Sequence, residues 1–187
     1  MFMQLIPKGL NLNSLACNAG KQIRQQPANP FGVELKYKSM STYTQILYQI
    51  VFSTKERQPV LHKENRPELF KYMWGVLKNN NCHLYRINGV EDHIHIITHL
   101  HPSVALADLI KDLKISSSGN IKEKGLFNNF SGWQSGYGAF TYAIKEKDRL
   151  IEYVINQEEH HKTVSFREEY INLLNEHNIE FDEKYLL

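Results

Sequence analysis

The stretch Val90-Glu91-Asp92-His93-Ile94-His95-Ile96-Ile97-Thr98-His99-Leu100 combines β-branched residues with three histidines at odd-numbered positions. Side chains alternate between the two faces of a strand, so His93 and His95 share one face, about 7 Å apart along the backbone. Both imidazoles can reach one metal ion, and the intervening isoleucines point to the opposite face. Nine histidines in the chain make such a pair unexceptional by chance. The stretch therefore predicts a buried strand in the middle of a sheet with a candidate metal site, and His99 on the same face.

Length and composition restrict the class of protein. A chain of 187 residues that is 42% hydrophobic predicts one globular domain. Its two cysteines, Cys17 and Cys82, form neither a disulfide framework nor a C-x-x-C metal site, which suits a reducing cytoplasm. No run of 18 apolar residues is present, so we expect a cytoplasmic protein without a membrane partner. The net charge of +2 permits nucleic-acid binding without requiring it.

The pattern of the chain changes near Met40. Residues 1–39 are rich in Asn, Gln, Gly and Pro and show no strand or helix period, which predicts an irregular N-terminal extension. Regular patterning occupies residues 40–187, which we take as the domain.

Hydrophobic periodicity within the domain predicts alternating strands and helices around the histidine strand. Asn88-Gly89 predicts the hairpin turn into that strand. The other expected strands cover residues 43–52, 82–87 and 133–143. The expected helices cover residues 66–80, a segment opened by residues 102–103 and weakened at 116–119, residues 147–157 and residues 166–176. This order predicts an α+β fold: a ferredoxin-like (RRM-like) split βαβ sandwich with an antiparallel sheet and added C-terminal helices.

The helix expected at residues 147–157 has two polar positions of interest. Tyr153 and Gln157 lie outside its apolar stripe and four residues apart, on a row that His161 would extend if the helix continued. Pattern alone favours a solvated helix face for this row.

Four motifs in order resemble the single-tyrosine HUH transposases of small bacterial insertion sequences, the IS200-like family, and their REP-associated relatives. The resemblance covers residues 42–187. Glu91 stands where relatives often carry proline, and residues 1–39 have no counterpart. The motifs are Val51-Phe52-Ser53-Thr54-Lys55, Asp92-His93-Ile94-His95, Trp133-Gln134-Ser135-Gly136-Tyr137-Gly138-Ala139-Phe140 and Tyr153-Val154-Ile155-Asn156-Gln157-Glu158-Glu159-His160-His161.

The resemblance implies a specific activity. It implies that His93 and His95 bind a divalent ion, Mg²⁺ or Mn²⁺, that Tyr153 is the nucleophile, and that Gln157 completes the metal site. The substrate would be single-stranded DNA with hairpin ends, cleaved through a 5′-phosphotyrosine link with a free 3′-hydroxyl and without a nucleotide cofactor. It further implies a homodimer in which each tyrosine helix completes the partner's histidine site.

Other residues are weaker candidates for function. Tyr137 and Tyr142 are competing phenols, although aromatic residues in strands usually pack. The adjacent His160 and His161 are expected to be solvated. The candidate DNA contacts are the basic residues along and beyond the second helix and two histidines: Lys111, Lys114, Lys122, Lys124, His99 and His161.

Two other functions fit the same residues. One is a domesticated module that binds single-stranded nucleic acid without turnover. The other is a relaxase or replication-initiator nickase, which would share the chemistry and differ in substrate.

Overall fold

The computed structural model describes residues 42–186, so the extension expected at residues 1–39 lies outside the described residues. Four strands form one sheet in the order β2-β3-β1-β4, and every neighbouring pair is antiparallel. The strands are β1 (Leu47–Ser53), β2 (His83–Gly89), β3 (His93–His99) and β4 (Gly138–Tyr142). The helices are α1 (Arg66–Asn79), α2 (Leu106–Lys124), α3 (Lys147–Ile155), α4 (Gln157–His160) and α5 (Phe166–Glu176), with 3-10 turns η1 (Lys55–Arg57), η2 (Ile144–Glu146) and η3 (Glu183–Tyr185).

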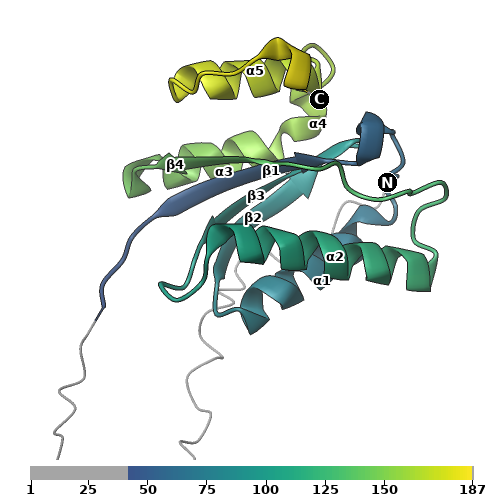
Figure 1. Cartoon of the computed structure of the whole chain (residues 1–187), viewed down its shortest axis with the longest axis horizontal. Coiled ribbons are helices and arrows are strands. Elements are labelled where there is room, and N and C mark those ends of the chain that lie inside the picture. The colour runs from purple at the N-terminus through teal and green to yellow at the C-terminus, as the bar shows by residue number, and fades with distance from the viewer. Residues whose placement is uncertain (1–41, 187) are drawn as a thin grey trace, which may run out of the picture. The chain divides into compact units, whose positions relative to one another are not determined.

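The element order confirms the ferredoxin-like α+β plan, and β3 lies in the interior of the sheet as predicted. Helices α1 and α2 cover one face of the sheet, while α3 and α5 lie on the other side (Figure 1). Side chains along β3 alternate between the two faces of the sheet, so they pack in turn against these two helix layers. Ile94 and Ile96 belong to the large core that includes buried residues of α1 and α2. Ile97, on the opposite face, packs with Leu150 and Val154 of α3.

The hairpin that leads into β3 differs from the prediction. Asn88 and Gly89 belong to β2 and pair with His95 and Ile94, so the turn comes later, where Val90 N donates to His93 O at 3.1 Å. Gly89 serves close packing: a Cβ atom there would lie 2.2 Å from His93 O. The glycine that suggested a turn is thus required by the approach of two paired strands.

Helix α2 also differs from the prediction. It begins at Leu106, later than the expected start, and it continues through the Ser116–Gly119 run to Lys124. The Ser117 hydroxyl donates to Leu113 O within the helix, which satisfies it without breaking the helix. Gly125 follows the last helical residue and caps the helix, because its left-handed backbone (φ 60°) ends the helical path.

The helix expected at residues 147–157 is divided. Helix α3 ends at Ile155, Asn156 caps it outside helical geometry, and Gln157 begins the short α4. The chain therefore changes direction between Tyr153 and His161, so these residues do not form the single row expected for one continuous helix. Among the described residues, no helix is long and apolar enough to cross a membrane.

Candidate metal centre and tyrosine site

The two histidines of β3 lie on the sheet face covered by the C-terminal helices. Both side chains are fully buried. Their ring centroids are 5.1 Å apart, and Phe166 of α5 stacks on the His93 ring at 4.2 Å. The ring positions are therefore held by packing against α5.

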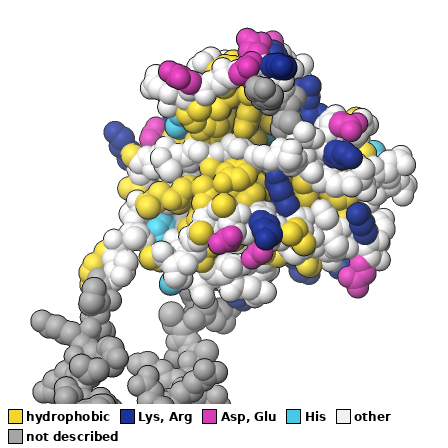
Figure 2. Space-filling view, viewed as in Figure 1, with side chains coloured by type: hydrophobic (Ala, Val, Ile, Leu, Met, Phe, Trp, Pro, Cys, Tyr) yellow, Lys and Arg dark blue, Asp and Glu magenta, His cyan; other side chains and the backbone are white. Residues whose placement is uncertain are grey.

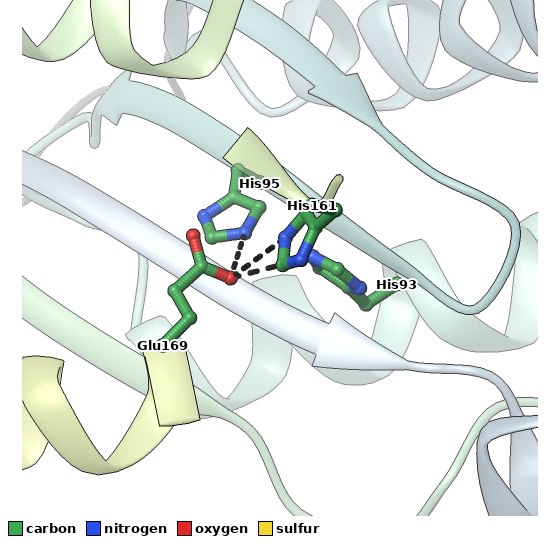
Figure 3. A group of neighbouring side chains, drawn as sticks. All are labelled: His93, His95, His161 and Glu169. Atoms are coloured by element: carbon green, nitrogen blue, oxygen red, sulfur yellow. Dashed lines mark ion pairs between the residues drawn. The ribbon is translucent and has the colours of Figure 1, made fainter. Parts of the chain in front are cut away.

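The C-terminal segment brings two more metal-ligating side chains to this pair. His161 follows α4, and Glu169 enters from α5 (Figure 3). Glu169 Oε2 lies close to three imidazole nitrogens: 3.4 Å from His93 Nε2, 3.3 Å from His95 Nε2 and 3.1 Å from His161 Nε2. One ligand atom from each of the four residues lies within 4.8 Å of the others. Three imidazoles and one carboxylate thus surround one point.

Each imidazole is anchored through its other nitrogen. His93 Nδ1 lies 2.7 Å from Asp92 Oδ1, and His161 Nδ1 lies 2.8 Å from Val164 O. An acceptor at Nδ1 holds the proton there and leaves the Nε2 lone pair available, as in carboxylate–histidine–metal arrangements. His93 is thus prepared for metal binding through Nε2, whereas Nε2 of His161 also contacts Gln157 Oε1 at 2.9 Å.

The anchor of His95 is an amide. The Gln49 side-chain nitrogen lies 3.1 Å from His95 Nδ1, and Gln49 Oε1 is buried without a hydrogen-bond partner. A half-turn of this amide would present Oε1 to a protonated Nδ1 and satisfy both groups. His95 would then have the same tautomer as the other two histidines.

The inner atoms of the cluster lack hydrogen bonds. Nε2 of His93, Nε2 of His95 and Oε2 of Glu169 are buried and have no hydrogen-bond partner. Buried polar atoms are normally satisfied, so a convergent unsatisfied group indicates a missing partner. A divalent cation satisfies two nitrogen donors and one carboxylate oxygen at once. The residues present therefore fit a metal ion.

The electrostatics of His95 and Glu169 agree with this fit. Burial lowers the pKa of His95 despite the nearby Glu169 carboxylate, which favours the neutral form that binds metals. Burial also acts to lower the pKa of His93, but hydrogen bonds and charges from Asp92 and Glu169 raise it overall. Burial opposes ionisation of Glu169, yet the surrounding histidines, led by His95, hold the pKa of its carboxyl well below the usual range. Glu169 is therefore an anionic ligand candidate.

Tyr153 and Gln157 both contact Glu169. The Tyr153 hydroxyl donates to Glu169 Oε1, and the Gln157 amide nitrogen donates to the same oxygen at 2.8 Å. Gln157 Oε1 lies 2.9 Å from His161 Nε2. The structure thus brings the predicted tyrosine and amide to the two histidines of β3. Burial, followed by the charge of Glu169, raises the pKa of Tyr153, so its hydroxyl stays protonated at neutral pH.

The tyrosine lies in the site of its own chain. The Tyr153 and His95 rings are 6.1 Å apart between centroids, and α3 packs on β3 through Val154. The competing phenols differ in position: Tyr137 is 38% exposed, whereas Tyr142 lines the same pocket as Tyr153 and has a pKa raised mainly by burial. A single chain therefore contains the histidines and the tyrosine that the resemblance assigns to two subunits.

Two pockets reach this cluster. One of about 240 Å³ is lined by Tyr153, Glu169 and Arg149, among others. A larger one of about 570 Å³ is lined by His161 and Asp92. The buried cluster is therefore approached by two hollows, one of which reaches the tyrosine.

The predicted basic strip does not lie at this site. It follows α2, on the sheet face opposite the histidines. Lys111 and Lys122 are exposed, whereas Lys124 pairs with Glu68 at 2.5 Å. Lys114 donates to Gln134 O at 2.8 Å, and burial lowers its pKa to about 8. Figure 2 shows Lys and Arg side chains interspersed with Asp and Glu on one face of the molecule.

The two histidines predicted as DNA contacts lie in different parts of the structure. His99 Nδ1 lies 3.0 Å from Ile46 O, at the far end of β3 and outside the four-residue cluster. The His161 side chain is only 10% exposed and belongs to the cluster, so the expectation of a solvated pair is wrong for this residue. The change of chain direction at Asn156 is the physical reason, because it turns His161 toward β3.

Glu169 was missed by the sequence interpretation, although a signal for it exists. It lies three residues after Phe166 and four before Leu173, on the apolar face of α5, and it is 2% exposed. A carboxylate within an apolar stripe is unfavourable unless it is paired or binds a metal. The signal is a charge on the buried face of a predicted helix.

The site and fold define a protein with a histidine cluster and a tyrosine on a ferredoxin-like sheet. Residues 42–157 match the family model described as "Transposase IS200 like", so the chain belongs to the IS200-like transposase family and is a transposase. His161 and Glu169 lie beyond the matched residues. No curated protein matches the chain.

Two solved structures are similar to the chain. One is a protein of Deinococcus radiodurans R1 described as a candidate transposase, with 21% identity, a TM-score of 0.49, and coverage of 64% of this chain and 97% of that chain. The other is a REP-associated tyrosine transposase bound to a REP hairpin, with 13% identity, a TM-score of 0.49, and coverage of 67% of this chain and 76% of that chain.

Proposed function

We propose that this transposase cleaves and rejoins single-stranded DNA through a covalent bond to Tyr153, with a divalent ion, Mg²⁺ or Mn²⁺, bound beside it. One observation carries the proposal. The Tyr153 hydroxyl and the Nε2 atoms of His93 and His95 all approach the carboxylate of Glu169. A phenol placed at a metal-ligand cluster is suited to attack a phosphate held there.

The chain's own residues account for the movement of atoms. Tyr153 Oη forms a bond to phosphorus while the bond from phosphorus to the 3′ oxygen of the preceding nucleotide breaks. The Tyr153 hydroxyl, oriented by its hydrogen bond to Glu169 Oε1, gives its proton to solvent in the pocket that Tyr153 lines, because a carboxyl with a strongly lowered pKa is a poor proton acceptor. The departing oxygen takes up a proton from solvent water and becomes a free 3′-hydroxyl. Attack by that hydroxyl on the 5′-phosphotyrosine reverses the step, so strands are rejoined without a nucleotide cofactor.

The metal ligands have a separate role. His93 and His95 would hold the ion, and Gln157, which orients Glu169 and His161, would support it. A bound divalent ion supplies positive charge that stabilises the extra negative charge on the phosphate. The attack by a phenol with a raised pKa depends on such stabilisation.

We further propose hairpin DNA as the substrate and a homodimer that holds two ends, in the cytoplasm. Membership of the IS200-like transposase family supports both. Strand β4 supports the dimer, because within residues 42–186 it is an edge of the sheet that pairs only with β1. An open edge of this kind is a natural position for contact with a second subunit.

The test uses labelled single-stranded DNA that contains a hairpin, incubated with the full chain and Mn²⁺. We expect an adduct that survives denaturing electrophoresis and is lost in Tyr153→Phe, which keeps the ring and deletes the hydroxyl. Tyr142→Phe is the matched control and should retain the adduct. Binding without an adduct in the wild-type chain would instead indicate a binding module, and an adduct that maps to Tyr137 or Tyr142 would identify another nucleophile.

A further inference from the structure

We propose that the ion is bound by four side chains and that the site selects a transition-metal ion, such as Mn²⁺ or Zn²⁺, over Mg²⁺. The inference rests on the metal dependence in the proposed function and adds ligands from beyond the residues matched by the family model. The four ligands are His93, His95, His161 and Glu169.

The geometry supports His161 as a full ligand. Its Nε2 lies 3.1 Å from Glu169 Oε2, a shorter approach than that of either histidine of β3. Its Nδ1 lies 2.8 Å from Val164 O, and ligation through Nε2 requires the Gln157 amide, whose Oε1 lies 2.9 Å from that nitrogen, to move away. The His161 and His93 rings meet edge to face at 4.5 Å. His161 is thus oriented as strictly as the strand histidines.

The geometry also supports Glu169. Its Oε1 is engaged by Tyr153 and Gln157, while Oε2 is buried without a hydrogen bond. The occupied oxygen fixes the carboxylate plane, and the free oxygen faces the three imidazoles. Ligands on opposite sides of one ion lie about 4.2 Å apart for bonds of about 2.1 Å. The distances of 3.1–3.4 Å from Glu169 Oε2 to the three Nε2 atoms already suit ligands of one ion, and the rest of the cluster, which lies within 4.8 Å, moves inward on binding.

The donor set decides the type of ion. Mg²⁺ prefers oxygen ligands in octahedral geometry and gives up its water reluctantly, whereas imidazole suits zinc, iron and similar ions. Three nitrogen donors and one carboxylate therefore disfavour Mg²⁺. For a given site of this type, affinity rises from Mn²⁺ toward Zn²⁺. The burial of His93 and His95 also leaves little space for the water shell of Mg²⁺.

The experiment measures ion binding to the metal-free full chain by titration calorimetry, without DNA. In the wild-type chain we expect one ion per chain, with Zn²⁺ tighter than Mn²⁺ and Mn²⁺ at least about tenfold tighter than Mg²⁺. This ranking of affinities is measured on the wild-type chain alone. Equal affinity for Mn²⁺ and Mg²⁺ would overturn the selectivity.

Two variants test the added ligands. His161→Ala and Glu169→Gln should each weaken Mn²⁺ binding by about tenfold or more. His62→Ala changes an exposed histidine and should leave it unchanged. Glu168→Gln makes the same change one residue away, where glutamine preserves the capping box with Ser165. Wild-type Mn²⁺ affinity in both test variants would exclude His161 and Glu169 as ligands.

A parallel adduct assay separates this inference from the proposed function. A covalent adduct supported by Mg²⁺, together with unchanged Mn²⁺ affinity in both variants, would overturn the inference and leave the function intact. Tight Mn²⁺ binding that depends on both residues, without any adduct, would support the inference and overturn the proposed function.

Discussion

The Tyr153 hydroxyl donates a hydrogen bond to the carboxylate of Glu169, sixteen residues further along the chain. This bond joins α3 to α5 across the sheet face that carries the histidines. It also places a protonated phenol against a buried anion whose other oxygen faces the imidazoles. Cleavage, metal binding and the packing of α5 are therefore coupled through one carboxylate.

Replacement of His95 by alanine should abolish cleavage and also destabilise the fold. The side chain is fully buried and bonded to Gln49, whose amide would lose its partner. We expect a loss of roughly 1–3 kcal/mol in the free energy of unfolding, measured by chemical denaturation. His99→Ala, near the end of the same strand, is the control and should keep the adduct. Full cleavage by His95→Ala would contradict the metal assignment.

Gln157→Leu should weaken Mn²⁺ binding by about 10–100-fold, as is common when a residue that orients metal ligands is removed. Leucine fills a similar volume but cannot bond to Glu169 or to His161, which both contact the Gln157 amide. Calorimetry measures the affinity directly. Asn175→Leu changes an exposed amide of α5 outside the site and serves as the control. Unchanged affinity in Gln157→Leu would show that the amide neither binds the ion nor orients its ligands.

Mixing two inactive variants tests whether the site is built within one chain. Tyr153 lies beside His95 of the same chain, so we expect a mixture of His95→Ala and Tyr153→Phe proteins to remain without adduct after verified subunit exchange. Each chain would then lack one essential part. Recovered cleavage would show that α3 crosses to the partner, the arrangement that the family resemblance implies.

Gly89→Ala should destabilise the hairpin that positions His93. The added Cβ would lie 2.2 Å from His93 O, and relief requires the paired strands to separate. We expect a loss of roughly 1–3 kcal/mol in the free energy of unfolding. Gly75→Ala, in α1 with no atom within 4 Å of the new Cβ, is the matched control and should add about 0.5–1 kcal/mol. Equal effects of the two changes would contradict the role of Gly89.

Local patterns were sufficient for most of the fold. Alternation in β3 separated His93 and His95 from the core isoleucines, and helical spacing placed α5 at the bounds that the structure shows. Such patterns succeed because the period of a side chain along a strand or helix is set by backbone geometry. The element order then left the ferredoxin-like sheet as the natural arrangement.

Only the tertiary structure decided the composition of the site. His161 lies in the tyrosine motif and Glu169 is a charge within an apolar stripe, but neither pattern shows that these residues meet the strand histidines. They reach β3 because the chain turns at Asn156 and α5 packs over the histidines. Side-chain spacing along a chain does not encode that turn. The sequence by itself determined which faces were apolar and which residues were reactive. The packing of α5 decided which of these reactive residues meet, because burying its apolar face carries Glu169 into the centre of the cluster.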